Sequence, residues 1–486
     1  MPDTVKLERI STGTPALDAV LSGGFPRCSM IVITGEPGAG KTVLALQAVF
    51  HAARAGKRCA YFTTLSEPSL KFLRFLQLFR FFDQELFDER IRVHDLGSAL
   101  RAGDTEAAFR QLTEQVEQWE PELVVIDSFK AIHDLIRAPY KGRTFVYDIS
   151  VHMAGWGTTT LLVGEYTEEE RHRLPEFAVA DGIVRLAISR QELASIRELE
   201  VHKLRGSSFV SGIHYFDIGA DGFRFYPRVR VPDEVMRLQS ASTAQVGFGI
   251  PGLDELVSGG VLADSSTLVF GSSGTGKTTL ALSFLLEGVR RGEPVVMLTL
   301  EETLGQLRHN AASVGLDLEA ASTKGLLHLS FTPPVELSTD RYLHETRELV
   351  ARVGAKRLVL DSLTSLGLGV ISERRYKELV YALAKSMRAL GITLLLTMET
   401  AESFGSAQVT GHGLSYSADN LLYLRFVEMD GQLERAISFL KARGLALNSG
   451  VHRMTISREG VKVEGDQRFR KARGLLTGLP MQAPLP

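Results

Sequence analysis

Two stretches of the chain carry residue types that can hold a phosphate group. Residues 271–278 read GSSGTGKT and residues 35–42 read GEPGAGKT, so both match the pattern G-x-x-x-x-G-K-[ST]. Glycines allow a backbone path in which several N–H groups point at phosphate oxygens, the lysine adds charge near the outer phosphates, and the final hydroxyl can contact Mg²⁺. Each stretch lies between apolar runs typical of a strand and a helix, which predicts two nucleotide sites.

All residues of the two loops are expected to contribute to nucleotide binding. Lys277 is expected, in addition, to take part in catalysis through its charge. The predicted binding residues are Gly35, Glu36, Pro37, Gly38, Ala39, Gly40, Lys41 and Thr42 in the first loop, and Gly271, Ser272, Ser273, Gly274, Thr275, Gly276, Lys277 and Thr278 in the second.

Two apolar runs that are typical of strands end in a carboxylate. Asp361 ends the run LVLD, and Asp127 ends the run LVVID. A carboxylate in this position can hold the water shell of Mg²⁺ opposite the loop hydroxyl. The predicted metal residues are therefore Asp361 with Thr278, and Asp127 with Thr42. The alternative is that each aspartate is a solvent-exposed acid at the end of a strand.

Two adjacent glutamates, Glu301 and Glu302, follow the apolar run VVMLTL. Sheets of parallel strands place ligands at the carboxyl ends of the strands. A carboxylate there can orient and deprotonate an attacking water or hydroxyl group. The residues alone leave a second interpretation open, in which the pair starts the next helix, because acidic residues favour a helix N-terminus.

The two loops belong to an internal repeat. Lys41 and Lys277 lie 236 residues apart, the Gly-Gly pairs that start at Gly23 and Gly259 keep the same spacing, and Asp127 and Asp361 lie 234 residues apart. A repeat of this length is a duplicated domain rather than a solenoid unit. We predict a first domain over residues 1–240, with a linker from about 228, a second domain over 245–466, and a mobile tail over 467–486.

Composition is that of an ordinary globular protein. The chain has 486 residues, 44% of them hydrophobic and 23% charged, with a formal net charge of −2. The two cysteines, Cys28 and Cys59, show no metal or disulfide pattern and suit a reducing compartment. No signal peptide or membrane-length apolar run is evident, so we expect a cytoplasmic protein with no membrane contact.

Continuous apolar runs alternate with helical segments in both halves, which is typical of parallel strands buried on both faces. The expected fold class is α/β, with two tandem P-loop domains, each a mostly parallel twisted sheet flanked by helices. Antiparallel strands are expected to close each half. The expected strands cover residues 30–34, 58–64, 123–127 and 158–163 in the first half, and 267–270, 294–300, 357–361, 392–397, 419–427 and 435–440 in the second.

Residues 69–90 contain six phenylalanines and several leucines. We expect a helix here, and a helix that is apolar on so much of its circumference must bury more than one face. Packing in the core is one explanation, and contact with another subunit or a partner is the other. The matching stretch of the second half, 304–314, is far more polar.

The chain resembles the KaiC family, a two-domain branch of the RecA-type ATPases. The shared features occur in the same order in both halves and span the whole chain. They are the Leu-Asp and Ser-Gly-Gly residues before each loop, both phosphate loops, Leu300-Glu301-Glu302-Thr303, Asp361-Ser362, and the Lys-x-Arg-Gly segments 203–206 and 441–444.

The resemblance implies a homo-hexamer of stacked rings that binds ATP with Mg²⁺ between neighbouring subunits. It also implies a role in circadian-type timing or signalling, with a KaiB-like or other signalling protein as a possible partner. Glu301 matches the catalytic base of the family, and Glu302 matches the neighbour of that base. The residues that match cations reaching the phosphates of the next subunit are Lys203, Arg205, Lys441 and Arg443. Taken alone, each cation could equally be a solvated strand end.

The first half departs from the family at the catalytic pair. Leu65 and Ser66 align with the two glutamates, and neither can act as a base; Glu67 is displaced by one position, and Glu165 follows another strand. We therefore expect the first half to bind ATP well, to hydrolyse it weakly and to hold the ring together.

The family transfers phosphate from ATP to an adjacent Ser-Thr pair in the second half. Ser415 and Tyr416 align with that pair, so the serine is retained and the threonine is not. A phenol is longer and more acidic than an alkyl hydroxyl, so its geometry differs. The resemblance implies a serine/threonine-type autokinase with Ser415 as the first candidate and Tyr416 as the second. The alternative is a loop without phosphorylation sites.

Two other functions compete with this interpretation. A RecA-type DNA-dependent ATPase shares the core, but the slight negative charge and the absence of a helix-turn-helix, a zinc motif or a long basic run argue against a nucleic-acid partner. A nucleotide-gated assembly scaffold with incidental turnover is the other, and the missing carboxylates favour that role for the first half.

Overall fold

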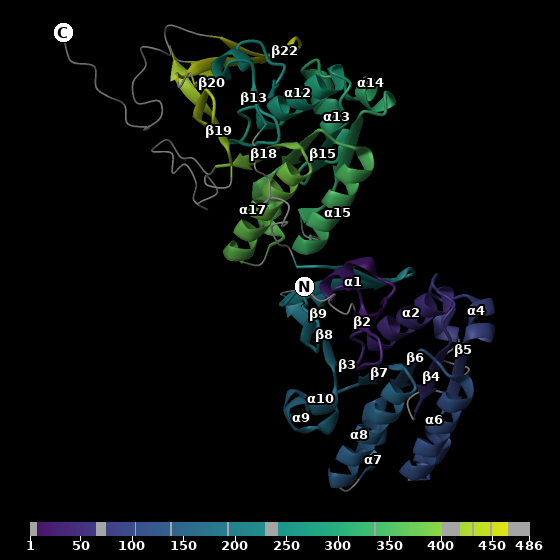
Figure 1. Ribbon diagram of the computed structural model, residues 1–486. Helices are drawn as coiled ribbons and strands as arrows, with labels where there is room; N and C mark the ends of the chain where they lie inside the picture. Colours follow the sequence, from purple (N-terminus) through teal and green to yellow (C-terminus); the bar gives the residue numbers. More distant parts are fainter. Residues whose placement is uncertain are drawn as a thin grey trace, which may run out of the picture. The chain divides into compact units, whose positions relative to one another are not determined.

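The computed structural model describes most of the chain. The described residues are 7–64, 74–102, 104–136, 139–191, 194–228, 242–334, 337–370, 372–400, 418–429, 432–447 and 450–464. The chain divides into two compact units, Met1–Arg228 and Val229–Pro486, each described here by itself (Figure 1). Most of the expected linker and the whole expected tail lie outside the described residues. The domain boundaries given above therefore stay predictions.

The first unit is built on a nine-stranded sheet with the order β11-β10-β9-β8-β3-β7-β6-β4-β5. The six strands from β8 to β5 run parallel, and β9, β10 and β11 continue the sheet as antiparallel neighbours. Its strands are β3 (Met30–Gly35), β4 (Cys59–Thr63), β5 (Ile91–Asp95), β6 (Leu123–Asp127), β7 (Thr159–Gly164), β8 (Gly182–Gln191), β9 (Ala194–Leu204), β10 (Ile213–Gly219) and β11 (Gly222–Tyr226), and β1 (Arg9–Ile10) pairs with β2 (Phe25–Pro26) in a separate two-stranded sheet.

Helices cover both faces of this sheet. Alternate residues of β3 show why: Ile31 packs with α2 on one face, and Val32 packs with α6, α7 and α8 on the other, as the arrangement in Figure 1 shows. The helices are α1 (Pro15–Val20), α2 (Lys41–Arg54), α4 (Gln84–Arg90), α5 (Gly97–Arg101), α6 (Thr105–Trp119), α7 (Phe129–Leu135), α8 (Pro139–Gly155), α9 (Glu168–Arg173) and α10 (Pro175–Val179).

The second unit repeats this plan, with the strand order β16-β15-β17-β18-β14-β19-β20-β21-β22. The strands from β16 to β19 are parallel and the last three are antiparallel. Its strands are β14 (Ser266–Gly271), β15 (Val295–Thr299), β16 (Leu327–Phe331), β17 (Arg357–Asp361), β18 (Thr393–Glu399), β19 (Asn420–Met429), β20 (Gln432–Ala442), β21 (His452–Ser457) and β22 (Gly460–Glu464), and β12 (Gln245–Val246) pairs with β13 (Val261–Leu262) in a separate two-stranded sheet.

The faces of the second sheet are covered in the same way. Val269 of β14 packs with α12, and its neighbour Leu268 packs with the α15–α17 side (Figure 1). The predicted α/β fold class, with a mostly parallel sheet flanked by helices in each half, is confirmed. The helices are α12 (Lys277–Arg290), α13 (Leu304–Ser313), α14 (Leu318–Thr323), α15 (Thr339–Val353), α16 (Leu363–Leu368) and α17 (Glu373–Ala389), and η1 (Asp254–Val257) is a 3₁₀ turn.

The prediction of one apolar helix over 69–90 is wrong within the part that is described. Residues 77–81 form turns and a bend, and α4 starts only at Gln84, because the Asp83 side chain accepts a hydrogen bond from Leu86 N and caps a new helix. The phenylalanines gather around Phe50 of α2 from both sides of this break: the ring centroids of Phe81 and Phe82, before α4, lie 5.7 and 5.6 Å from that of Phe50, and that of Phe87, within α4, lies 6.5 Å away. Core packing therefore accounts for Phe79, Phe81, Phe82 and Phe87 without a continuous helix, whereas Phe75 is 49% exposed and Phe72 lies outside the described residues.

One glycine of each phosphate loop is required by its conformation and by its neighbour. Gly40 and Gly276 have φ values of 100° and 102°, which disfavour other residues. A Cβ on Gly40 would lie 2.4 Å from Ile218 of β10, and a Cβ on Gly276 would lie 2.5 Å from Ile456 of β21. The antiparallel strands of each sheet thus pack directly against the phosphate loop. Among the described residues, no helix is long and apolar enough to cross a membrane.

Candidate nucleotide sites

In the second domain, the phosphate loop joins β14 to α12 and holds its lysine inward. Lys277 Nζ donates to the carbonyl oxygens of Gly271, at 3.0 Å, and Ser272, at 2.9 Å. Burial lowers the pKa of the Lys277 ammonium, while the carboxylates of Glu399, Asp361 and Glu301 act in the opposite direction. The lysine is therefore placed over its own loop, where a phosphate can replace the carbonyl oxygens as partner.

Asp361 lies at the end of β17 beside the loop hydroxyl. Its Oδ2 accepts a hydrogen bond of 2.8 Å from Thr278 Oγ1, and its Oδ1 accepts one from Thr397 of β18. The side chain is 2% exposed, and burial raises its pKa, which the two hydroxyl donors partly offset. The alternative of a solvent-exposed acid at the strand end is thus wrong for Asp361.

The two glutamates after β15 point to different partners. Glu301 Oε1 accepts hydrogen bonds from Ser362 Oγ and from Ser365 Oγ, the second at 3.0 Å. Glu302 accepts from Asn310 Nδ2 of α13 at 3.2 Å. Glu301 is therefore held beside the carboxyl end of β17, whereas Glu302 is turned toward the following helix.

Neither glutamate caps that helix. Thr303 is the N-cap of α13, and it forms a capping box with Gln306. The alternative that the glutamate pair starts the next helix is therefore wrong, because Thr303, the residue after Glu302, caps it. This leaves the Glu301 carboxylate available beside the serines.

The first domain repeats the phosphate and metal parts of this arrangement. Lys41 Nζ donates to Gly35 O at 2.9 Å and to Glu36 O at 2.8 Å. Thr42 Oγ1 donates to Asp127 Oδ2 at 2.7 Å. The lysine, hydroxyl and aspartate predicted for this half are brought together, as they are in the second.

The hydroxyl that supports the aspartate differs between the domains. In the first domain Tyr61 of β4 donates to Asp127 Oδ2 at 2.7 Å, whereas in the second domain Thr397 of β18 supports Asp361 from the other neighbouring strand. Sequence reasoning missed both hydroxyls. Tyr61 matches Met297 in the other half, so no repeated residue type marks the position.

A cavity of about 860 Å³ opens at the first phosphate loop. Its lining includes Lys41, Thr42, Asp127 and Glu165, and Phe75 lies at the same cavity. Pockets of this size hold drug-sized ligands. Glu165, the residue after β7, also forms an ion pair with Lys41, with 3.5 Å between Oε1 and Nζ. Leu65, Ser66 and Glu67 lie outside the described residues.

Glu399 is a further carboxylate that sequence reasoning missed. It ends β18 in the second domain, 234 residues after Glu165, the same spacing that separates the two aspartates. Its backbone N–H donates to Thr364 Oγ1 at 2.8 Å. The sequence does carry a signal for Glu399: adding the 234-residue spacing of the two aspartates to Glu165 leads to it.

Lys203 and Arg205 of the first domain lie near the amino ends of the parallel strands, whereas their own phosphate loop lies at the carboxyl ends. Lys203 pairs in register with Ile183, and Ile183 pairs with Val32, three residues before Gly35 and so about 10 Å back along β3. Arg205 forms an ion pair with Asp181, at 3.3 Å, just before β8.

The second domain places its two cations in the same way. Lys441 Nζ donates to Ala418 O at 2.7 Å, and Arg443 lies 3.6 Å from a carboxylate oxygen of Asp419. The Arg443 side chain is 72% exposed. None of the four predicted trans-acting cations contacts the phosphate loop of its own domain within the described residues, and their action on a neighbouring subunit stays a prediction.

Residues 401–417, which include Ser415 and Tyr416, lie outside the described residues.

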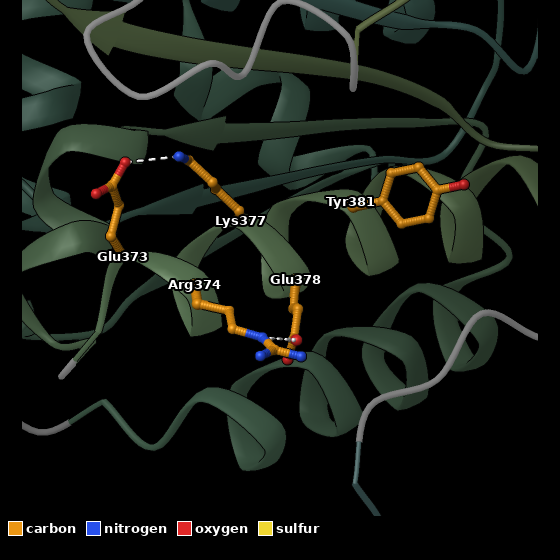
Figure 2. Close-up of a pocket in the computed structure, with 5 residues that line it drawn as sticks. All are labelled: Glu373, Arg374, Lys377, Glu378 and Tyr381. Carbon is orange, nitrogen blue, oxygen red and sulfur yellow. Dashed lines mark hydrogen bonds and ion pairs between the residues drawn. The ribbon is translucent and has the colours of Figure 1, made fainter.

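A separate shallow pocket lies along α17, as Figure 2 shows, lined by Glu373, Arg374, Lys377, Glu378 and Tyr381. Its charges pair along the helix: Lys377 with Glu373 at 2.6 Å and Arg374 with Glu378 at 3.1 Å. These pairs stabilise the helix surface, so this pocket gives no sign of a chemical site.

The Thr278–Asp361 pair fits a bound cation. Asp361 is a buried carboxylate whose hydrogen-bond partners are hydroxyl groups, and it forms no ion pair with a lysine or arginine among the described residues. A buried charge without a charged partner is costly, and a cation at this position removes that cost. Thr42 and Asp127 offer the same two oxygens in the first domain.

Parallel sheets with a phosphate loop at the carboxyl end of a central strand, a lysine over the loop and a Thr–Asp pair define a P-loop nucleotide-binding protein. The family model for the KaiC ATPase matches twice, over residues 10–230 and 246–468. The chain belongs to the KaiC family and is a P-loop ATPase.

Curated relatives agree over almost the full chain. The circadian clock oscillator protein KaiC of Acaryochloris marina is 29% identical over 99% of this chain and 93% of its own length. That of Picosynechococcus is also 29% identical, over 98% and 92%. The circadian clock oscillator protein KaiC 1 of Synechocystis is 28% identical, over 98% and 92%.

Proposed function

We propose that this protein is an ATPase of circadian-type timing or signalling that binds Mg-ATP in both domains and hydrolyses it mainly in the second. One observation carries the proposal. Both domains place a lysine and a Thr–Asp pair at a phosphate loop, but among the described residues only the second holds a glutamate, Glu301, beside the aspartate through two serine hydroxyls. The timing role rests on the names of the relatives.

Each Thr–Asp pair is the proposed site of Mg²⁺. Thr278 with Asp361, and Thr42 with Asp127, would hold the ion, which would supply positive charge next to the phosphates. The residues themselves do the remaining work. Lys277 contacts the outer phosphates, and Glu301 accepts the proton of a water molecule that its carboxylate orients. In the first domain Lys41 binds phosphate, while the positions of the glutamate pair carry Leu65 and Ser66.

The active assembly in this proposal is a homo-hexamer. The position of Lys203, Arg205, Lys441 and Arg443 away from their own loops supports a role at the site of an adjacent subunit. A cation supplied by a neighbour stabilises the charge of the transition state. Alanine at Arg443 should then lower turnover without lowering ATP binding in the same chain.

Autophosphorylation in the second domain is the finer part of the proposal. Ser415 is the first candidate and Tyr416 the second, because they align with the phosphorylated pair of the family. Intact-mass spectrometry after incubation with Mg-ATP tests it, with Ser415→Ala and Tyr416→Phe to assign the site. No added phosphate would end the kinase part and leave the ATPase part standing.

Measurement of phosphate release together with ring size tests the proposal as a whole. We expect Mg²⁺-dependent ATP hydrolysis, which Lys277→Ala reduces to the slow turnover of the first domain and Lys41→Ala mostly preserves, and a hexamer that forms with ATP. A scaffold with incidental turnover predicts ATP-dependent assembly with turnover that is insensitive to Glu301→Gln. A DNA-dependent ATPase predicts stimulation by DNA with a steep salt dependence.

A further inference from the structure

The first domain lacks the glutamate pair, but it does hold a carboxylate at its phosphate site. Glu165 follows directly on β7, and β7 pairs with β3 so that Gly164 lies opposite Thr34, one residue before the loop. Glu165 is therefore level with the start of the phosphate loop. Its side chain lines the same cavity as Lys41, Thr42 and Asp127.

Distance places this carboxylate within reach of the reacting phosphate. Glu165 Oε1 lies 3.5 Å from Lys41 Nζ, and Lys41 is the group that contacts the outer phosphates in a phosphate loop. A carboxylate next to that lysine is about one water molecule away from a γ-phosphate. The side chain is 54% exposed, so it can turn from the lysine toward a water molecule.

The second domain makes the contrast. Glu399 occupies the same strand end there, but no ion pair joins it to Lys277 within the described residues, and Glu301 is held beside Asp361 by two serines. The second site thus has a fixed base as well as the strand-end glutamate. In the first site, Glu165 at the strand end is the one carboxylate among the described residues that forms an ion pair with the loop lysine, Lys41.

We propose that Glu165 is the catalytic base of a slow ATPase in the first domain. This rests on the proposed function, because it requires ATP at the first loop. Glu165 accepts one proton of a water molecule while the water oxygen bonds to the γ-phosphorus. The bond from phosphorus to the bridging oxygen breaks, its electron pair stays on ADP, and Glu165 then returns the proton to solvent.

The geometry also accounts for the slow rate. Glu165 is an exposed side chain paired with Lys41, whereas Glu301 is oriented by Ser362 and Ser365 before the nucleotide binds. A base that has to leave an ion pair and find its orientation contributes less than one that is already positioned.

The test uses the full chain with Glu301→Gln, which leaves the first domain as the source of turnover. Adding Glu165→Gln should lower residual ADP formation from Mg-ATP by about 100-fold or more, with bound ATP unchanged. Glu165→Asp should retain part of the rate. Glu169→Gln, an exposed neighbour on α9, is the matched control and should have no effect.

Two outcomes overturn the inference: residual turnover that Glu165→Gln leaves intact, or turnover that is lost in Glu67→Gln and not in Glu165→Gln. Absence of residual turnover with ATP bound also counts against it. Lys41→Ala in the same background separates this failure from that of the proposed function. If the full chain binds only one ATP and Lys41→Ala leaves that number unchanged, the first domain is not a nucleotide site and the broader proposal fails there.

Discussion

The two phosphate sites of this chain share one half of their chemistry and differ in the other. In both, a loop lysine and a Thr–Asp pair meet at the same strand ends. The second site adds Glu301, held by serines, whereas the first pairs its lysine with Glu165. The difference teaches that the backbone of the fold places the phosphate and metal groups, while the group that activates water depends on side chains that vary between the copies.

The substitution expected to have the largest effect is Glu301→Gln. An amide cannot accept the proton of water, so turnover by the second domain should fall by about 10²- to 10⁴-fold, with ATP binding retained and the slow turnover of the first domain remaining. Steady-state phosphate release, with bound nucleotide measured in parallel, checks this. Glu302→Gln is the matched control, because Glu302 bonds to Asn310 and should cost much less. Equal losses in the two variants would contradict the different roles assigned to them.

Asp361→Asn tests the metal half of the comparison. Burial raises the pKa of Asp361, so without ligand its ionisation costs stability. The contribution of this carboxyl to stability is present below its unfolded pKa and is lost as pH rises through the raised folded pKa. Without nucleotide at neutral pH, the variant should therefore have a higher melting temperature than the wild type. Mg-ATP at one hundred times its Kd should stabilise the wild type by about 2.7 kcal/mol, and the variant should lose this stabilisation.

Thermal unfolding of the second domain with and without Mg-ATP, over a range of pH, makes this measurement. Loss of stability in Asp361→Asn without nucleotide would show that the carboxylate is needed for folding rather than for a cation. Asp127→Asn provides the companion test in the first domain.

The supporting hydroxyls are expected to have the smallest effects. Tyr61→Phe removes a donor to Asp127, and Thr397→Val gives the second domain the residue type found at Val163. A hydrogen bond to a charged group is worth about 1.5–3 kcal/mol, so each variant should weaken Mg-ATP binding in its own domain by at most about 10- to 150-fold. Isothermal titration of each single-site protein, in a Lys41→Ala or Lys277→Ala background, measures it. Weakening in the other domain would contradict the assignment.

The sequence was sufficient for the scaffold and for the residues that follow directly on a strand. Asp127, Asp361 and both loops come from local patterns, since the parallel strands bring their carboxyl ends to one edge. Tyr61 and Thr397 were beyond prediction because their contacts depend on which strands are neighbours in the sheet. The break before Gln84 was missed because the phenylalanine content signals burial, and not the turn that lets those rings surround Phe50.

Single-turnover hydrolysis by the wild-type protein, loaded at both sites with Mg-ATP, tests the central claim most directly. We expect two phases of equal amplitude with rates that differ by about tenfold or more, the fast phase lost in Lys277→Ala and the slow phase lost in Lys41→Ala. A single phase, or a fast phase that survives Lys277→Ala, would contradict the conclusion that the second copy is the main ATPase.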